Sequence, residues 1–140
     1  MKLKVSREQV WVVSLQDRPG ALAKKLRALA EGSANLEFVI ARRTSKKKAG
    51  GVAFVTPLRG ARQMAAAKKA KLKKASSLHG VRVEGPDKRG LGAMITEAVA
   101  DAGLNLRGLS AAAIGKRMVA NLAFDSEGDA AKAMRVLRNL

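Results

Sequence analysis

The spacing of apolar residues changes several times along this chain, and each spacing predicts a particular secondary-structure element. Residues 10–15, Val-Trp-Val-Val-Ser-Leu, are mostly β-branched, aromatic or apolar, which predicts a buried strand. Between Ala21 and Ala30 leucine recurs at helical spacing, and Gly32 is placed to end that helix. The chain therefore opens with a strand that leads into an amphipathic helix.

The same alternation of strands and helices continues to the end of the sequence. The basic stretch from Arg42 to Gly51 and the pair Gly115-Lys116 are the expected hairpin connections. We expect the remaining elements to be strands at 36–41, 52–56, 81–84, 106–114 and 118–124 and helices at 60–75, 91–102 and 129–140. The order β-α-β-β-α thus occurs twice, which predicts an α+β fold with antiparallel sheets that carry helices on one face.

A short motif at the first helix returns later in the sequence. Residues 17–20, Asp-Arg-Pro-Gly, followed by Asn35-Leu36, recur seventy positions later as residues 87–90, Asp-Lys-Arg-Gly, and Asn105-Leu106. Phe and Met residues coincide at the same offset. A period of this length predicts two similar units, residues 1–75 and 76–140. Because about seventy residues is near the lower limit for a self-sufficient core, we expect the two units to pack together.

Charge is distributed unevenly between the two halves. The net charge is +17, and residues 1–75 hold 19 Lys and Arg against 4 Asp and Glu, whereas residues 76–140 hold 9 against 7. Such asymmetry favours an acidic partner such as nucleic acid, although a solvated charged face would have the same composition. The candidate nucleic-acid contacts are Arg42, Arg43, Lys46, Lys47 and Lys48 on the first hairpin and Lys68, Lys69, Lys71, Lys73 and Lys74 on the second helix.

Composition argues against several classes of protein. The chain has no cysteine and one histidine, His79, so we expect neither a metal site nor a cofactor. His79 has no acidic or nucleophilic neighbour in the sequence, and Asp17 and Asp87 lie in turns rather than as a close pair, so we do not expect an enzyme. No apolar run approaches the ~20 residues of a membrane helix, and we expect a soluble, cytoplasmic protein without a membrane partner.

The duplicated motif resembles that of a known regulatory module. A strand, the turn Asp-Arg-Pro-Gly-Ala-Leu-Ala into a helix, and Ala-Asn-Leu before the next strand are similar to the ACT domain, which typically binds amino acids. The resemblance covers both halves, although the second has Arg89 where the motif usually has proline. It implies two ferredoxin-like units paired as a pseudo-dimer. An ACT unit also has a fourth strand after its second helix, to which the pattern assigns no segment.

The resemblance and the chemistry of the turn together predict an amino-acid site. Free N–H groups at the helix start suit a carboxylate, and Asp17 suits an ammonium group. A helix of roughly 12 residues at about 1.5 Å per residue separates Asp17 from Asn35 by about 18 Å, too far for one small ligand. We therefore expect composite sites across a twofold axis, in which Asp17 approaches Asn105 and Asp87 approaches Asn35. The predicted ligand-binding residues are Asp17, Arg18, Pro19, Gly20, Ala21, Leu22, Asn35, Asp87, Arg89, Gly90, Leu91 and Asn105.

Two alternatives remain open from the sequence. Asp17 and Asn35 also suit simple capping and turn roles. The RNA-recognition motif shares the element order, and residues 51–55, Gly-Val-Ala-Phe-Val, with Trp11, resemble its signature. Val52 stands where that motif has an aromatic ring, which argues against base stacking but not against phosphate contact. The sequence thus predicts a regulatory protein that binds a small molecule, with RNA binding as the alternative function and assembly as a homo-oligomer undecided.

Overall fold

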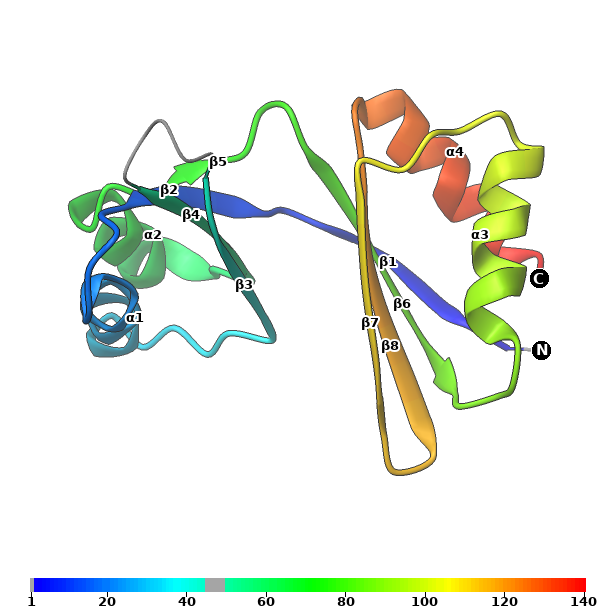
Figure 1. Ribbon diagram of the computed structural model, residues 1–140, viewed down its shortest axis with the longest axis horizontal. Helices are drawn as coiled ribbons and strands as arrows, with labels where there is room; N and C mark the ends of the chain where they lie inside the picture. The colour runs from blue at the N-terminus through cyan, green and yellow to red at the C-terminus, as the bar shows by residue number, and fades with distance from the viewer. Residues whose placement is uncertain (1, 45–49) are drawn as a thin grey trace. The chain divides into compact units, whose positions relative to one another are not determined.

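The computed structural model describes residues 2–44 and 50–140, and it divides into two compact units (Figure 1). We call Gln9–Ala75 the basic unit, because it holds 16 Lys and Arg against 3 Asp and Glu. The terminal unit consists of Met1–Glu8 and Ser76–Leu140. The first eight residues were expected in the first repeat, residues 1–75, whereas the structure groups them with the second half of the chain.

The basic unit is a four-stranded antiparallel sheet with two helices on one face, as expected (Figure 1). Its strands lie in the order β3-β4-β2-β5, and the helices are α1 and α2. The bounds are β2 Trp11–Leu15, α1 Ala21–Glu31, β3 Phe38–Arg43, β4 Gly51–Thr56, α2 Gly60–Lys69 and β5 Lys73–Lys74.

The terminal unit repeats this arrangement with one difference in the origin of its edge strand. Its sheet order is β1-β6-β8-β7, and helices α3 and α4 cover one face. The bounds are β1 Lys4–Glu8, β6 His79–Pro86, α3 Leu91–Asp101, β7 Gly108–Ile114, β8 Arg117–Phe124 and α4 Glu127–Arg138. The two ferredoxin-like units predicted from the sequence are confirmed.

The fourth strand of each sheet was not predicted. In the terminal unit it is β1, which pairs along Lys4–Glu8 with Gly80–Glu84 of β6. In the basic unit it is β5, which pairs only with Trp11 and Val12 of β2. The helix predicted at 60–75 ends at Lys69, and Lys71 adopts a positive φ of 74° that turns the chain back to the sheet. Lys71, Lys73 and Lys74 therefore do not belong to α2.

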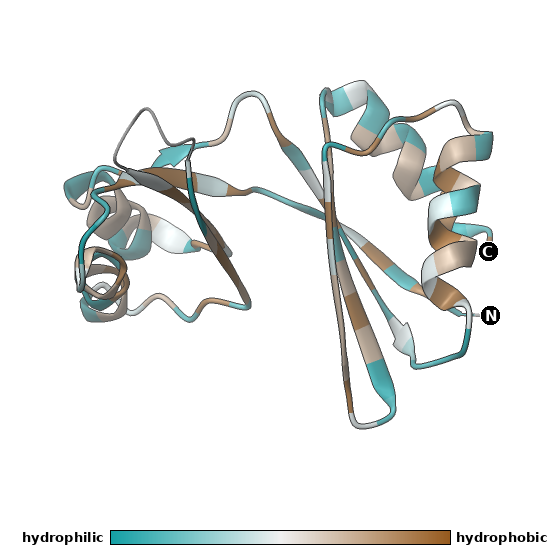
Figure 2. Ribbon diagram, in the orientation of Figure 1, coloured by the Kyte–Doolittle hydropathy of each residue, from teal (hydrophilic) through white to brown (hydrophobic). Residues whose placement is uncertain are grey.

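Each unit has its own hydrophobic core. Trp11, Leu29, Val55 and Leu72 are among the side chains of the basic core. The terminal core contains the buried residues Val5, Val81, Val83, Leu91, Ile95, Val99, Ala120, Leu122, Phe124, Ala130, Ala133 and Leu137. Hydrophobic segments are concentrated in the strands and along the helices that cover them (Figure 2).

Glycine explains why the turn motif is duplicated. Gly20 precedes α1 with φ 86°, and Gly90 precedes α3 with φ 81°, a left-handed conformation that a side chain would disfavour. α1 ends at Glu31 with Gly32 as its C-cap, as predicted, but the left-handed position is that of Ser33 at 71°, since the φ of Gly32 is −82°. Gly32 instead provides space, since a Cβ at this position would overlap the Cβ of Ala66 on α2.

Candidate functional site

The Asp-Arg-Pro-Gly turn of the basic unit forms one wall of a small cavity, which we call the turn pocket. Its volume is about 230 Å³. It is lined by Leu15, Gln16, Asp17, Arg18, Ala21, Leu22, Ala41, Arg42, Arg43, Gly50 and Gly51. Four of the predicted ligand-binding residues of the first repeat, Asp17, Arg18, Ala21 and Leu22, thus border the same cavity.

The backbone of the turn leaves hydrogen-bond donors at the start of α1. The Ala21 N–H donates to the Arg18 carbonyl at 3.3 Å, and the Lys24 N–H donates to the Gly20 carbonyl at 3.0 Å. No side chain caps the helix. In the part of the chain that the structure describes, the N–H groups of Leu22 and Ala23 have no acceptor, as expected of a helix start. Such donors favour an anionic group.

Asp17 contributes a carboxylate to the turn pocket rather than a helix cap. Its Oδ1 lies 3.2 Å from Nε of Arg43, and both side chains are solvent-accessible. The capping role considered for Asp17 is therefore wrong. Arg18 and Arg42 also line the cavity, so that three arginines and one carboxylate are among its described lining residues.

The second repeat keeps the turn but not its charged surroundings. The Leu91 N–H donates to the Lys88 carbonyl at 3.1 Å, and the Met94 N–H donates to the Gly90 carbonyl at 3.0 Å, as in the first repeat. The position equivalent to Arg43 is Ala113, so Asp87 has no equivalent arginine. The predicted site residue Leu91 is 2% exposed and belongs to the core, so its side chain cannot contact a ligand.

The remaining predicted site residues lie outside the turn pocket. Asn35 is exposed between α1 and β3, and Asn105 is exposed between α3 and β7. Neither residue lines the turn pocket, which agrees with the expected separation of Asp17 and Asn35 along α1. Pro19 and Arg89 are exposed in their turns. The predicted pairing of each aspartate with the asparagine of the other repeat stays a prediction.

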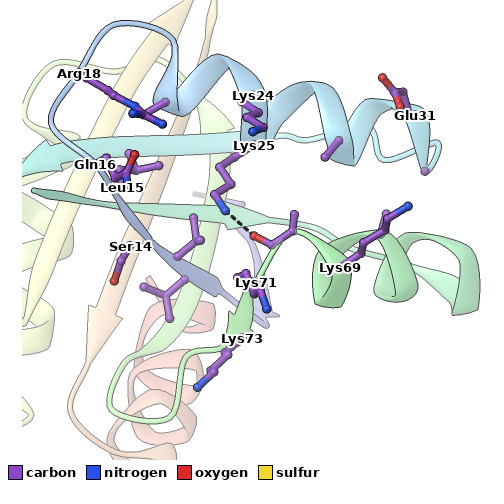
Figure 3. A pocket seen from close by; sticks show the side chains of 17 residues that line it. Ser14, Leu15, Gln16, Arg18, Lys24, Lys25, Glu31, Lys69, Lys71 and Lys73 are labelled. Atoms are coloured by element: carbon purple, nitrogen blue, oxygen red, sulfur yellow. Dashed lines mark hydrogen bonds between the residues drawn. The ribbon is translucent and has the colours of Figure 1, made fainter.

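A second and larger cavity in the same unit runs along β2 and between α1 and the end of α2 (Figure 3). We call it the basic groove, and its volume is about 1180 Å³. It is lined by Val12, Val13, Ser14, Leu15, Gln16, Arg18, Ala21, Lys24, Lys25, Ala28, Glu31, Gly32, Ala66, Lys69, Ala70, Lys71 and Lys73. Most of its floor consists of alanine, glycine and strand residues, which leave it open.

Cations surround this groove on two sides. One set comes from the turn and α1, and the other from the end of α2 and the segment that leads into β5 (Figure 3). Glu31 is the single carboxylate among the lining residues. The Lys25 ammonium donates to the Ala70 carbonyl at 2.8 Å, which satisfies an acceptor at the C-terminal end of α2. The cations of the groove are Arg18, Lys24, Lys25, Lys69, Lys71 and Lys73.

The two cavities share part of their walls. Leu15, Gln16, Arg18 and Ala21 line both the turn pocket and the basic groove. A ligand in one cavity therefore contacts residues that also shape the other.

The predicted nucleic-acid contacts do not form one cluster. Arg42 and Arg43 lie at the end of β3, beside the turn pocket, whereas Lys69, Lys71 and Lys73 line the basic groove. Lys68 lies in the last turn of α2, and the Lys74 ammonium is 5.8 Å from the centroid of the Trp11 ring. Lys46, Lys47 and Lys48 are outside the described residues. Sequence reasoning missed Lys24 and Lys25, whose side of α1 becomes part of a charged wall only in the folded unit.

His79 has an acidic neighbour that the sequence did not reveal. Its Nδ1 lies 3.1 Å from Oε2 of Glu127, which also accepts from Nη2 of Arg7 at 2.6 Å. The hydrogen bond from Arg7 is the main reason that the pKa of Glu127 falls to about 2. These residues join β1, β6 and α4 at the surface of the terminal unit, and among residues 2–44 and 50–140 no nucleophilic side chain is hydrogen-bonded to them.

Residues 2–44 and 50–140 contain neither a candidate metal site nor a candidate membrane-spanning helix. Within these ranges no three His, Cys, Asp or Glu side chains are grouped so that they could hold a metal ion. In the same ranges no helix is both long and apolar enough to cross a membrane.

The element order and the sheet topology give each unit the ferredoxin-type fold of an ACT domain, so the resemblance is confirmed at the level of the fold. Among solved structures, the protein BT0572 from Bacteroides thetaiotaomicron is similar with a TM-score of 0.76 at 12% identity, over 94% of this chain and 88% of that chain. The regulatory subunit of aspartate kinase from Thermus thermophilus is similar with a TM-score of 0.67 at 19% identity, and that from Thermus flavus with 0.62 at 20%. Both alignments cover 99% of this chain and 96% of the other. No protein-family model and no curated protein matches the sequence.

Proposed function

We propose that this protein is a non-catalytic regulatory protein that binds an amino acid in the turn pocket of the basic unit. The observation that carries the proposal is the combination of the unused N–H of Leu22 at the helix start, one carboxylate and three arginines among the described residues that line a single small cavity. The similarity in fold to regulatory subunits of aspartate kinase supports a regulatory role.

The cavity has the size of a small polar ligand. At about 30 Å³ per water molecule, its 230 Å³ correspond to roughly eight waters. The α-carboxylate of an amino acid would accept from the N–H group of Leu22, and the ammonium group would lie against Asp17. Exposed ion pairs contribute only about 0–1 kcal/mol, so the ammonium group can replace Arg43 beside Asp17 at little cost.

The charges of the turn pocket favour one class of amino acid. Arg18, Arg42 and Arg43 outnumber Asp17, and a ligand that brings one ammonium and two carboxylate groups balances them better than a neutral or basic amino acid. We therefore propose an amino acid with an acidic side chain.

RNA binding by base stacking has less support. Trp11, the aromatic residue that resembled an RNA-recognition signature, is 7% exposed and belongs to the core of the basic unit. Its ring is not available to stack on a base.

A thermal-shift experiment tests the proposed ligand. Because a ligand that binds only the folded state stabilises it, glutamate or aspartate at about 100 times its dissociation constant should add about 2.7 kcal/mol, whereas lysine and leucine should add little. Asp17→Asn should remove most of this stabilisation. Asp125→Asn is the matched control, since Asp125 forms an equally long 3.2 Å contact with Arg107 in the terminal unit.

Two results would contradict the proposal. An unchanged shift in Asp17→Asn would exclude Asp17 from the site. Equal shifts with leucine and glutamate would show that the arginines do not select the ligand.

A further inference from the structure

The edge of the basic sheet is incompletely covered beside the basic groove. β5 pairs with Trp11 and Val12, and the Ala75 N–H donates to the Val10 carbonyl at 2.8 Å. Hydrogen-bonding groups of an antiparallel strand alternate between its two sides, so the N–H and C=O of Ser14 point to the same side as those of Val12. In the described part of the chain, no strand lies beside β2 beyond Val12.

The terminal unit shows that the corresponding edge accepts a strand. At the offset of seventy residues, Ser14 corresponds to Glu84 of β6. Glu84 is paired with Lys4 of β1, and the pairing continues over five residues to Gly80 and Glu8. The same fold, with the same helices above the sheet, therefore carries an antiparallel strand at the position that is open in the basic unit.

The side chains around the two edges differ in charge. Lys24 and Lys25 of α1 correspond to Met94 and Ile95 of α3, and Ile95 is buried in the core that β1 helps to close. In the basic unit, Lys71 and Lys73 face the groove from the other side. An occupant of the groove therefore meets ammonium groups on both sides, which favours acidic side chains.

We propose that the basic groove docks an extended acidic segment of a partner protein as an additional antiparallel strand on β2. The backbone of the segment bonds to the N–H and C=O of Ser14. Since successive side chains of a strand alternate between faces, acidic residues at every second position meet Lys24, Lys25 and Lys71 on the helix side. No aromatic side chain lines the described groove, so a single-stranded nucleic acid would lack a stacking surface there.

Fluorescence anisotropy with a labelled peptide of about six residues, the usual length of a strand, tests the proposal. The peptide alternates glutamate and threonine, and a second peptide of the same sequence carries N-methyl groups on its threonine nitrogens. Trp11 and Val13 point into the core on the helix side, so Ser14 and the residue paired with it point to the other face, and that residue is a threonine when the glutamates meet the lysines. The first should bind and the second should bind at least about 10-fold more weakly, because methylation removes the strand hydrogen bonds. Equal binding of the two peptides would overturn strand pairing.

Variants of the protein locate the binding site. The double variant Lys24→Glu and Lys71→Glu should weaken binding at least about 10-fold. The matched control, Lys88→Glu with Lys132→Glu, reverses two exposed cations of the terminal unit and should change binding less than about 3-fold. Equal losses in the two variants would show that net charge alone attracts the peptide, which would overturn the proposal.

Ser14→Pro tests the edge itself. It removes the outward N–H, while the neighbouring bonds between β2 and β4 do not need it, and proline is tolerated at such positions of edge strands. Binding should be lost with Trp11 fluorescence unchanged, whereas Ser14→Thr should bind normally. Retained binding by a folded Ser14→Pro protein would overturn the proposal. Tighter binding of a single-stranded RNA oligonucleotide, lost in the Lys24 and Lys71 variant, would make the groove a nucleic-acid site instead.

Discussion

The two units of this chain share a fold but differ at one edge of the sheet. In the terminal unit, a five-residue strand from the start of the chain covers β6, and Val5 joins the core. In the basic unit, a two-residue strand leaves most of that edge open. The elements that define the fold have therefore been kept in both units, while the covering strand has not.

The helix above each edge differs in the same way. Position 95 is isoleucine and 1% exposed, whereas the equivalent position 25 is a half-buried lysine that bonds to the Ala70 carbonyl. An apolar residue suits a closed edge and a cation suits an open one. The two units therefore differ in the helix as well as in the edge strand. α1 carries a cation beside the open edge, where α3 carries an apolar residue beside the closed one.

Exchanging these two residues tests the comparison most directly. Ile95→Lys places an unpaired ammonium group in a closed core and should lower the free energy of unfolding by more than about 3 kcal/mol. Lys25→Ile removes one hydrogen bond at an open groove and should change the free energy of unfolding by less than about 1 kcal/mol. Denaturant unfolding followed by far-UV circular dichroism measures both.

Trp11 provides an internal control for this experiment. It is the only tryptophan and lies in the core of the basic unit, so its fluorescence reports on that unit. The effect of Ile95→Lys should therefore be larger in circular dichroism than in fluorescence. Similar small effects of both substitutions would mean that the two edges are equally open, which would contradict the comparison.

Much of the fold could be predicted from periodicity, but the two edge strands could not. Lys4–Glu8 contains one buried apolar residue, Val5, among polar and charged side chains, and no pattern of alternation reveals a strand. Lys73 and Lys74 followed a run of alanine and lysine that favours helix, and the left-handed turn at Lys71 ended that helix earlier than its composition suggests. In both cases pairing with a distant strand decided the structure, and a single sequence does not contain that information locally.

The local features of the candidate site could be predicted from the sequence, but its long-range contacts could not. The duplicated Gly20 and Gly90 marked the turns, because their left-handed backbone is a local requirement. Arg43 was recognised as a cation but not as the partner of Asp17, since 26 residues separate them. The basic groove was not predicted at all, because its walls come from β2, α1, α2 and β5, which only folding brings together.

The ends of α1 and α3 allow a second, smaller exchange. Ser33 has a φ of 71° and its equivalent Gly103 has 77°, so only the terminal unit has the residue that this backbone prefers. Ser33→Gly should stabilise the basic unit by about 0.5–1 kcal/mol, and Gly103→Ser should destabilise the terminal unit by about 1 kcal/mol. A Cβ at Gly103 meets no atom within 4 Å, so the effect would come from the backbone alone. Thermal unfolding measures both, and changes of the same sign would contradict the equivalence of the two positions.

The smallest expected effect is a loss of stability of the terminal unit at low pH. The terminal unit has a carboxylate, Glu127, whose Oε1 and Oε2 accept from the Arg7 guanidinium at 3.0 and 2.6 Å, and this bond is the main cause that lowers its pKa from 4.5 to about 2. Because the pKa is lower in the folded than in the unfolded state, the carboxylate stabilises the fold above about pH 4.5, and this contribution is lost as the pH falls toward 2. Glu127→Gln cannot titrate, so it should be less stable than the parent protein near neutral pH and should approach it on acidification. Thermal unfolding of both proteins across this range measures the difference.

Since Glu84 titrates equally in both proteins, its own lowered pKa cancels from the comparison. A difference that stayed constant down to pH 2 would show that Arg7 holds β1 to α4 without help from the charge of Glu127.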